Sequence, residues 1–191
     1  MSGKSQLKNT SNNISFIHSK HSELILLIGA GMLAIMLHKV LRWPLDIPGR
    51  HGLEFMAIFV FLRLASTQTW AASIASVGAI LATGLFSGGS SSIGIGMLIL
   101  ILQGLSLDLL YNHLTWRGRL LFLLPLIAAL VHAMKPIIKF LAQDHLSIYS
   151  DSLSSGLMIP VMSHCLFGFF GGLFGLLAWK AYTKSSQHFK P

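Results

Sequence analysis

Residues 64–107 contain no Asp, Glu, Lys or Arg, and this uncharged stretch constrains the fold more than any other feature of the chain. A transmembrane helix needs about 20 mainly apolar residues, so the stretch is long enough for two. Its natural break is SGGSSS at residues 87–92, because glycine and serine are typical of a turn. The whole chain is 53% hydrophobic and 10% charged, whereas a soluble domain carries about 25% charged residues. The sequence therefore predicts an integral membrane protein.

The other apolar runs extend this pattern to an all-α integral membrane bundle of about six transmembrane helices. The predicted spans are residues 23–41, 53–66, 70–86, 93–110, 120–141 and 157–182. The second span is the weakest, because it is short and interrupted by Arg63. The expected organisation is a flexible cytoplasmic tail (residues 1–21), the transmembrane domain (residues 22–183) and a second cytoplasmic tail (residues 184–191).

Basic residues predict the orientation of the chain, because Lys and Arg near helix ends favour the cytoplasmic side. Placing both termini inside leaves more of these residues on the cytoplasmic side than on the outer side. We therefore expect a multi-pass protein of the cell (inner) membrane. The chain has 14 Lys and Arg against 6 Asp and Glu. They lie mainly in tails and loops, so orientation explains them better than nucleic-acid binding.

Motifs for enzymatic chemistry are absent from the sequence, which has no HExxH, GxSxG, P-loop or paired carboxylates. We therefore expect no enzyme activity. The one cysteine, Cys165, excludes an intrachain disulfide. Histidines on neighbouring helices raise b-type haem as an alternative, but haem requires both imidazoles to face one plane. No cofactor is expected.

Polar residues from several segments are predicted to converge in the outer half of the bundle. Groups at that depth must face protein or a water-filled cavity, so a binding site is plausible there. Basic side chains would suit a carboxylate or phosphate group. The competing interpretations are cations that snorkel to lipid headgroups and buried neutral histidines bonded to carbonyls. The candidate substrate-binding residues are Arg50, His51, Glu54, His132, Lys135 and His164.

The first outer loop, RWPLDIPGRHG at residues 42–52, is also predicted to belong to this site. Its two prolines stiffen it, and it is longer than a simple connection between helices requires. We predict an ordered lid in which Arg50 and His51 face a ligand and Glu54 holds them by charge pairing.

Asp108 is the first charged residue after the uncharged stretch. A carboxylate in hydrocarbon costs about 2.5–3.5 kcal/mol even on the most lenient scale, so it needs an aqueous edge or a partner. Its position near the cytoplasmic end of the fourth span favours an interfacial carboxylate paired with the following basic loop, which contains Arg117 and Arg119. A proton relay, a substrate contact and a contact with a partner subunit remain open.

Small residues recur at helical spacing in the first and last spans. Ala30 and Ala34 lie four residues apart, and the last span contains Gly168, Gly171, Gly172 and Gly175. Such faces allow helices to approach closely within a membrane. The glycines are expected to pack inside the bundle, whereas the alanine face suits a second protein as well as a neighbouring helix.

Together these features resemble the substrate-binding membrane subunits (S components) of energy-coupling factor (ECF) transporters. The resemblance is carried by six short helices in 191 residues, the Ala30 and Ala34 pair, GLSLDLL at the end of the fourth helix and HCLFGFFGGLFG in the last. It implies capture of a vitamin or similar micronutrient from outside. It also implies docking through Ala30 and Ala34 on a transmembrane coupling protein that carries two ATPases.

The chain departs from the nickel and cobalt members of that family, which carry a metal-binding histidine at the extreme N-terminus. This chain begins MSGKSQ, so no metal ligand is expected. The competing class of function is a non-catalytic structural or assembly subunit of a larger membrane protein complex.

Overall fold

The computed structural model describes residues 20–40, 47–86, 93–115, 121–146 and 156–188. Every secondary-structure element in these ranges is helical, which confirms the all-α prediction. The elements are α1 (Lys20–Val40), α2 (Gly52–Ala65), α3 (Ala71–Phe86), α4 (Ile93–Thr115), the short 3-10 helix η1 (Leu121–Leu123), α5 (Leu124–Leu146) and α6 (Met158–His188). Four helices (α1, α4, α5 and α6) are long and apolar enough to cross a membrane, as in a multi-pass membrane protein.

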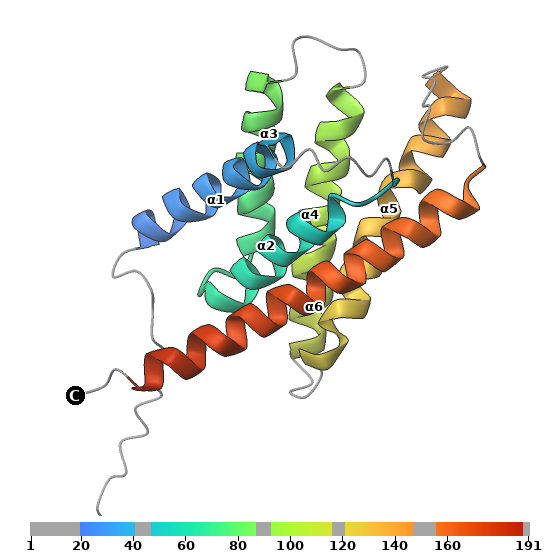
Figure 1. Ribbon diagram of the computed structural model, residues 1–191. Coiled ribbons are helices and arrows are strands. Elements are labelled where there is room, and N and C mark those ends of the chain that lie inside the picture. The colour runs from blue at the N-terminus through green and yellow to red at the C-terminus, as the bar shows by residue number, and fades with distance from the viewer. Residues whose placement is uncertain (1–19, 41–46, 87–92, 116–120, 147–155, 189–191) are drawn as a thin grey trace, which may run out of the picture.

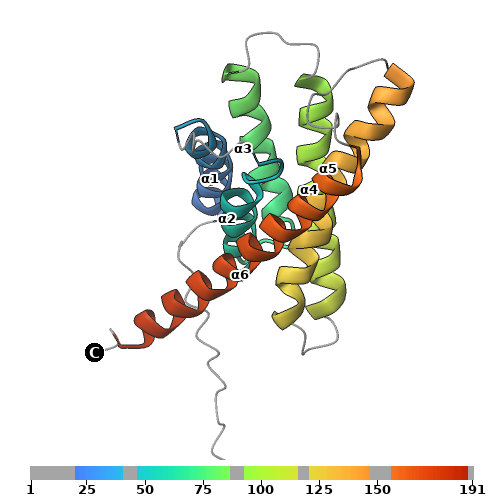
Figure 2. The same cartoon turned by 45° about the vertical axis from the view of Figure 1, so that its right-hand side comes forward.

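The helices form two sets that differ in direction. Figure 1 shows α3, α4 and α5 standing side by side, with α1, α2 and α6 crossing them obliquely. The turned view in Figure 2 shows α6 running obliquely across the bundle. Within the upright set α3 packs on α4 and α4 on α5, while α1 packs on α3 and α6 packs on α2 and α5.

Helix α2 lies at the centre of the bundle and contacts all five other long helices. Its buried residues include Phe55, Met56, Phe59 and Val60, spaced one and four residues apart as on one helical face. Its 14 residues extend only about 21 Å at about 1.5 Å per residue, less than the roughly 30 Å of a bilayer core. The prediction of a full span here is therefore not supported, and α3 with 16 residues is also short.

The ends of two predicted segments also differ from the structure. Helix α6 continues through Lys184 to His188, so much of the expected C-terminal tail is helical. Helix α1 begins at Lys20, inside the expected N-terminal tail, whose residues 1–19 lie outside the described part of the chain.

The glycines of α6 pack inside the bundle, as predicted. A Cβ atom at Gly171 would overlap the carbonyl oxygen of Gly52, and one at Gly172 would lie 2.6 Å from the Cβ of Ala128. The sequence did not single out the tightest approach, which joins α1 to α3. There a Cβ at Gly31 would overlap the Ala75 carbonyl oxygen, and one at Gly78 would overlap that of Ile28.

The alanine pair predicted as a docking face on α1 is not an open surface in this structure. Ala34 is 1% exposed and belongs to the hydrophobic core, because α1 turns this side toward α2 and α3. Ala30 is only partly exposed. The exposed side of α1 instead carries large apolar side chains, among them Ile25, Leu33 and Val40. Ala34 is therefore a packing residue of this bundle and not part of an open face.

Asp108 finds its partners inside the bundle, although the sequence favoured a pairing with the basic loop. Its carboxylate is 0% exposed. It accepts hydrogen bonds from the backbone N–H of Ala72 (3.2 Å) and of Ser73 (2.7 Å) and from the Ser73 hydroxyl (2.7 Å). These N–H groups belong to the first turn of α3, which has no intrahelical acceptors for them. Asp108 of α4 therefore caps α3, where a negative charge also complements the helix dipole.

Arg63 pairs with Asp108 at this end of α2. Its Nε lies 3.5 Å from Asp108 Oδ1, and its guanidinium stacks 4.4 Å from the centroid of the Tyr111 ring. Its terminal nitrogens donate to the Gln68 carbonyl and to Asn112 Oδ1, the latter at 3.3 Å.

Glu23 of α1 binds the segment that follows α2. Its carboxylate accepts hydrogen bonds from the Ser66 hydroxyl (2.6 Å), the Thr67 N–H and hydroxyl (2.7 Å each) and the Gln68 amide (3.2 Å). We refer to Glu23, Arg63 and Asp108 as the carboxylate network. It fixes the turn that joins α2 to α3.

Candidate functional site

A turn at residues 47–51 starts the site at the other end of α2. The Arg50 N–H donates to the Ile47 carbonyl at 3.4 Å, and the Gly52 N–H donates to the Gly49 carbonyl at 2.8 Å. Gly49 has a φ of 83°, a conformation that glycine adopts without the steric cost of a Cβ atom. A Cβ there would also meet the His164 ring at 2.7 Å. The turn therefore directs His51, the residue before α2, into the bundle.

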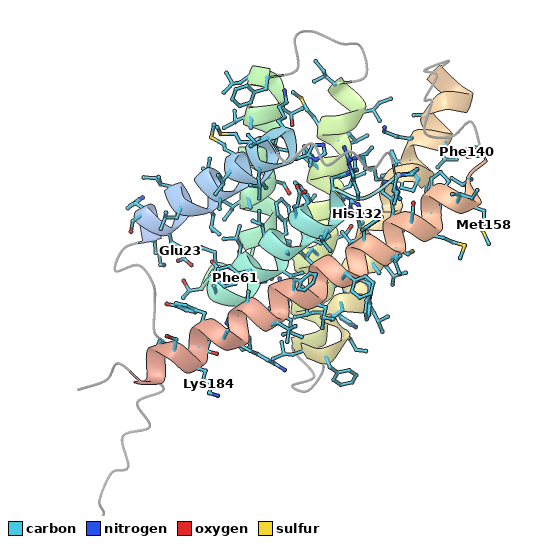
Figure 3. All side chains as sticks on the ribbon, viewed as in Figure 1. Glu23, Phe61, His132, Phe140, Met158 and Lys184 are labelled. Atoms are coloured by element: carbon cyan, nitrogen blue, oxygen red, sulfur yellow. The ribbon has the colours of Figure 1, made fainter. Side chains whose placement is uncertain are left out.

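Three imidazole rings, those of His38, His132 and His164, gather around that of His51, and we call the four together the histidine cluster. The ring centroid of His51 lies 5.2 Å from those of His38 and His132 and 5.7 Å from that of His164. His132 and His164 stack at 4.9 Å. The rings come from α1, the turn before α2, α5 and α6, so segments distant in sequence meet here. Figure 3 labels His132 in the interior of this region.

Hydrogen bonds fix two of these rings. His132 Nε2 lies 3.3 Å from the Gly49 carbonyl oxygen, and its Nδ1 lies 3.3 Å from Gln103 Nε2. His164 Nδ1 lies 2.7 Å from the Pro160 carbonyl oxygen. Because a carbonyl only accepts, these contacts place protons on Nε2 of His132 and Nδ1 of His164.

Lys135 joins the cluster through a hydrogen bond between its Nζ and Nε2 of His51. As an ammonium is a donor only, the imidazole accepts this bond. Burial lowers the pKa of His51 well below its ordinary value, and the nearby positive charge of Lys135 lowers it further. The site therefore holds His51 as a neutral imidazole beside one amine.

A pocket of about 180 Å³ adjoins the cluster. Apolar side chains of α1, α2 and α4 form much of its wall. Its polar wall consists of His38, His51, Thr83, Gln103, His132 and Lys135. None of the described residues that line it is acidic. The pocket thus presents imidazoles, an amide and an amine that no carboxylate of the lining neutralises.

The structure brings together four of the six predicted substrate-binding residues, namely His51, His132, Lys135 and His164. Arg50 and Glu54 do not line the pocket; they interact electrostatically with each other. One buried carboxylate oxygen of Glu54 has no hydrogen-bond partner among the described residues. The charge pairing predicted for Glu54 stays a prediction, and residues 41–46 of the predicted lid lie outside the described ranges.

Sequence reasoning missed two members of the site. Gln103 lies in the uncharged stretch, is 2% exposed, and contacts His132. A single amide between long apolar runs was the available signal, because a buried amide needs hydrogen-bond partners. His38 was not among the predicted site residues, but its ring packs on His51 and lines the pocket.

The side chains of this site offer both lone pairs and N–H groups to a ligand. Neutral imidazoles offer lone pairs to a metal ion or N–H groups to an anion, and Lys135 adds a positive charge. No family model, no curated protein and no solved structure matches the chain.

Proposed function

We propose that this chain is the membrane-embedded substrate-capture subunit of a micronutrient uptake transporter of the ECF type. The pocket beside the histidine cluster would be its binding site. The observation that carries the proposal is that the polar wall of this pocket, unlike the carboxylate network, contains no acidic residue among the described residues. Polar groups in a membrane bundle commonly mark a solute pathway, because burying them without a role is costly.

Charge indicates the kind of solute. Lys135 is the one charged residue in the pocket wall, and its lining has no acidic partner among the described residues. An anionic group could accept a hydrogen bond from the Lys135 ammonium. The volume of about 180 Å³ is below the roughly 300–1,000 Å³ of pockets for drug-sized ligands. A small anion, or the anionic end of a larger solute, fits this space.

The proposal includes partners. The sequence has no P-loop, so the energy for uptake would come from a transmembrane coupling protein and its ATPases. Ala34 is 1% exposed, so in this arrangement the coupling protein would contact other residues of α1.

Mass spectrometry of small molecules that co-purify with the detergent-solubilised protein tests the function. We expect an anionic solute in the wild type and its loss in Lys135→Met. Losing one charged contact costs about 1.5–3 kcal/mol, or roughly 10- to 150-fold in affinity. Lys184→Met is the matched control, because Lys184 is exposed near the end of α6. A wild type that carries no solute would favour the assembly-subunit alternative.

Orientation is tested separately. If the histidine cluster faces outward, a cysteine at position 50 reacts with an impermeant reagent in intact cells, and one at position 184 does not. Both are made in a Cys165→Ser background, since Cys165 is the one native cysteine. The opposite labelling would place the pocket on the cytoplasmic side.

A further inference from the structure

Three imidazoles of the histidine cluster lie close enough to share one ion. His51, His132 and His164 each offer a ring nitrogen, and these nitrogens lie within 4.8 Å of one another. His132 and His164 are buried, and His51 is partly exposed. Three histidines with one open position form a common zinc site.

The hydrogen bonds of two rings match those of metal ligands. A ligating histidine usually donates its other ring N–H to a carbonyl or carboxylate, which fixes the tautomer and the ring orientation. His164 donates from Nδ1 to the Pro160 carbonyl at 2.7 Å, so its Nε2 keeps a lone pair. His132 donates from Nε2 to the Gly49 carbonyl at 3.3 Å, so its lone pair is on Nδ1.

The side-chain amide of Gln103 faces the lone pair on His132 Nδ1, but it also has a second hydrogen-bond acceptor. Its Nε2 lies 3.3 Å from His132 Nδ1 and also 3.4 Å from the Val131 carbonyl oxygen. If His132 Nδ1 turned toward an ion, Gln103 would keep the bond to Val131. The amide is therefore compatible with ligation by His132.

We propose that His51, His132 and His164 bind one divalent transition-metal ion of the zinc, nickel or cobalt class. Imidazole suits these ions, and the three neutral ligands leave a position for water or an anionic group. Metal–nitrogen bonds of about 2.0–2.1 Å in a tetrahedral site place the nitrogens about 3.4 Å apart, so the rings close in by roughly 1 Å. His51 and His132 also line the pocket, so the ion lies at its wall.

Lys135 is the competitor of the ion in this site. Its ammonium donates to Nε2 of His51, and that lone pair is the one a metal ion needs. Binding of the ion replaces this hydrogen bond, and the positive charge of Lys135 opposes a second cation nearby. The inference goes beyond the proposed function, because the ion site exists whether or not an organic solute is captured.

Titration with Co²⁺ and Zn²⁺ tests the proposal on purified, chelator-treated protein in detergent. We expect one equivalent of Co²⁺ to give the visible absorption of a low-coordinate nitrogen site, and Zn²⁺ to displace it. His164→Leu should weaken binding by about 100-fold or more. The control is His113→Ala, which removes an exposed histidine of α4 outside the cluster and should leave binding unchanged.

Lys135→Met provides the outcome that separates the two proposals. It should strengthen Co²⁺ binding by about tenfold, because a competing charge is removed, although the proposed function expects it to lose an anionic solute. Wild-type protein without the Co²⁺ spectrum, or a spectrum that survives His164→Leu, would overturn the metal site and leave solute capture unaffected. If His164→Leu fails to fold, the Lys135→Met and His113→Ala titrations still test the site: a Lys135→Met protein that binds Co²⁺ no better than wild type would contradict it.

Discussion

The two ends of α2 carry two polar assemblies of opposite character. The carboxylate network lies at its C-terminal end and the histidine cluster at its N-terminal end. In Figure 3 the labelled Glu23 of the network and His132 of the cluster lie apart in the bundle. In the network, each carboxylate accepts at least three hydrogen bonds, and Arg63 pairs with Asp108. The cluster contains an amine and neutral imidazoles but no carboxylate among the described residues that line its pocket.

We interpret this difference as that between a structural role for the network and the proposed binding role for the cluster. A buried charge is tolerated when it is paired and hydrogen-bonded, and removing one partner then leaves the other uncompensated. The network meets that condition and fixes a turn. The cluster keeps lone pairs and positive charge that a ligand can satisfy, and a pocket adjoins it. Charge balance therefore distinguishes the two, although both are buried polar groups.

The largest expected effect is at the network. Asp108→Ala should lower the free energy of unfolding by about 3–5 kcal/mol, because Arg63 loses its buried partner and α3 loses its cap. Thermal unfolding in detergent measures it. The double variant Arg63→Met with Asp108→Leu should lose much less than the sum of the single variants, since no unpaired charge remains. A single variant as stable as the wild type would show that the network is not structural.

A glycine beside the cluster should have the next largest effect. In Gly52→Ala the new Cβ overlaps the His132 ring, and overpacking of this kind costs about 1–3 kcal/mol. Gly29→Ala is the matched control, because nothing lies within 4 Å of its Cβ position. Alanine there should stabilise α1 by up to about 1 kcal/mol. Equal effects of the two substitutions would mean that His132 is not confined by α2.

The sequence predicted the helices better than it predicted their roles. Long apolar runs and the SGGSSS break were sufficient to place six helices, because hydrophobic length is a local property. Whether α2 spans the membrane depends on its packing against five neighbouring helices. A local sequence pattern does not indicate such packing. Asp108 was placed near the correct end of α4, but its partners Ala72 and Ser73 are remote in sequence and bind partly through backbone N–H groups, which side-chain patterns cannot indicate.

The candidate site was likewise predicted only in part, because local patterns do not identify tertiary neighbours. His51, His132, Lys135 and His164 were predicted because polar residues are rare in apolar helices and topology placed them at one level. Ala34 was predicted to contact a partner because small residues at helical spacing indicate close approach without identifying the neighbour. That neighbour is the rest of this chain.

The free energy of unfolding should depend on pH through the titration of His51 in the histidine cluster. Its folded-state pKa lies below the ordinary value of about 6.5, so below that pH the unfolded chain binds the additional proton. The contribution of neutral His51 to the free energy of unfolding is complete above about pH 6.5. As the pH falls toward the folded-state pKa, this contribution is lost at up to about 1.4 kcal/mol per pH unit. Chelator-treated wild type and His51→Gln are compared by thermal unfolding between pH 8 and 5. Parallel curves for the two proteins would contradict this assignment.

The smallest effect, and the sharpest contrast with Asp108, is expected for the stability of Lys135→Met. Methionine has a similar length, and the substitution removes an ammonium that has no carboxylate partner in the pocket wall. It loses one hydrogen bond to His51, worth about 1 kcal/mol, and gains by avoiding the burial of a charge. The two contributions oppose each other, so the free energy of unfolding should change by less than about 1 kcal/mol. Thermal unfolding beside Asp108→Ala gives the comparison directly. A loss as large as that of Asp108→Ala would show that Lys135 is held by the fold for stability, and the histidine cluster would then be a second structural network.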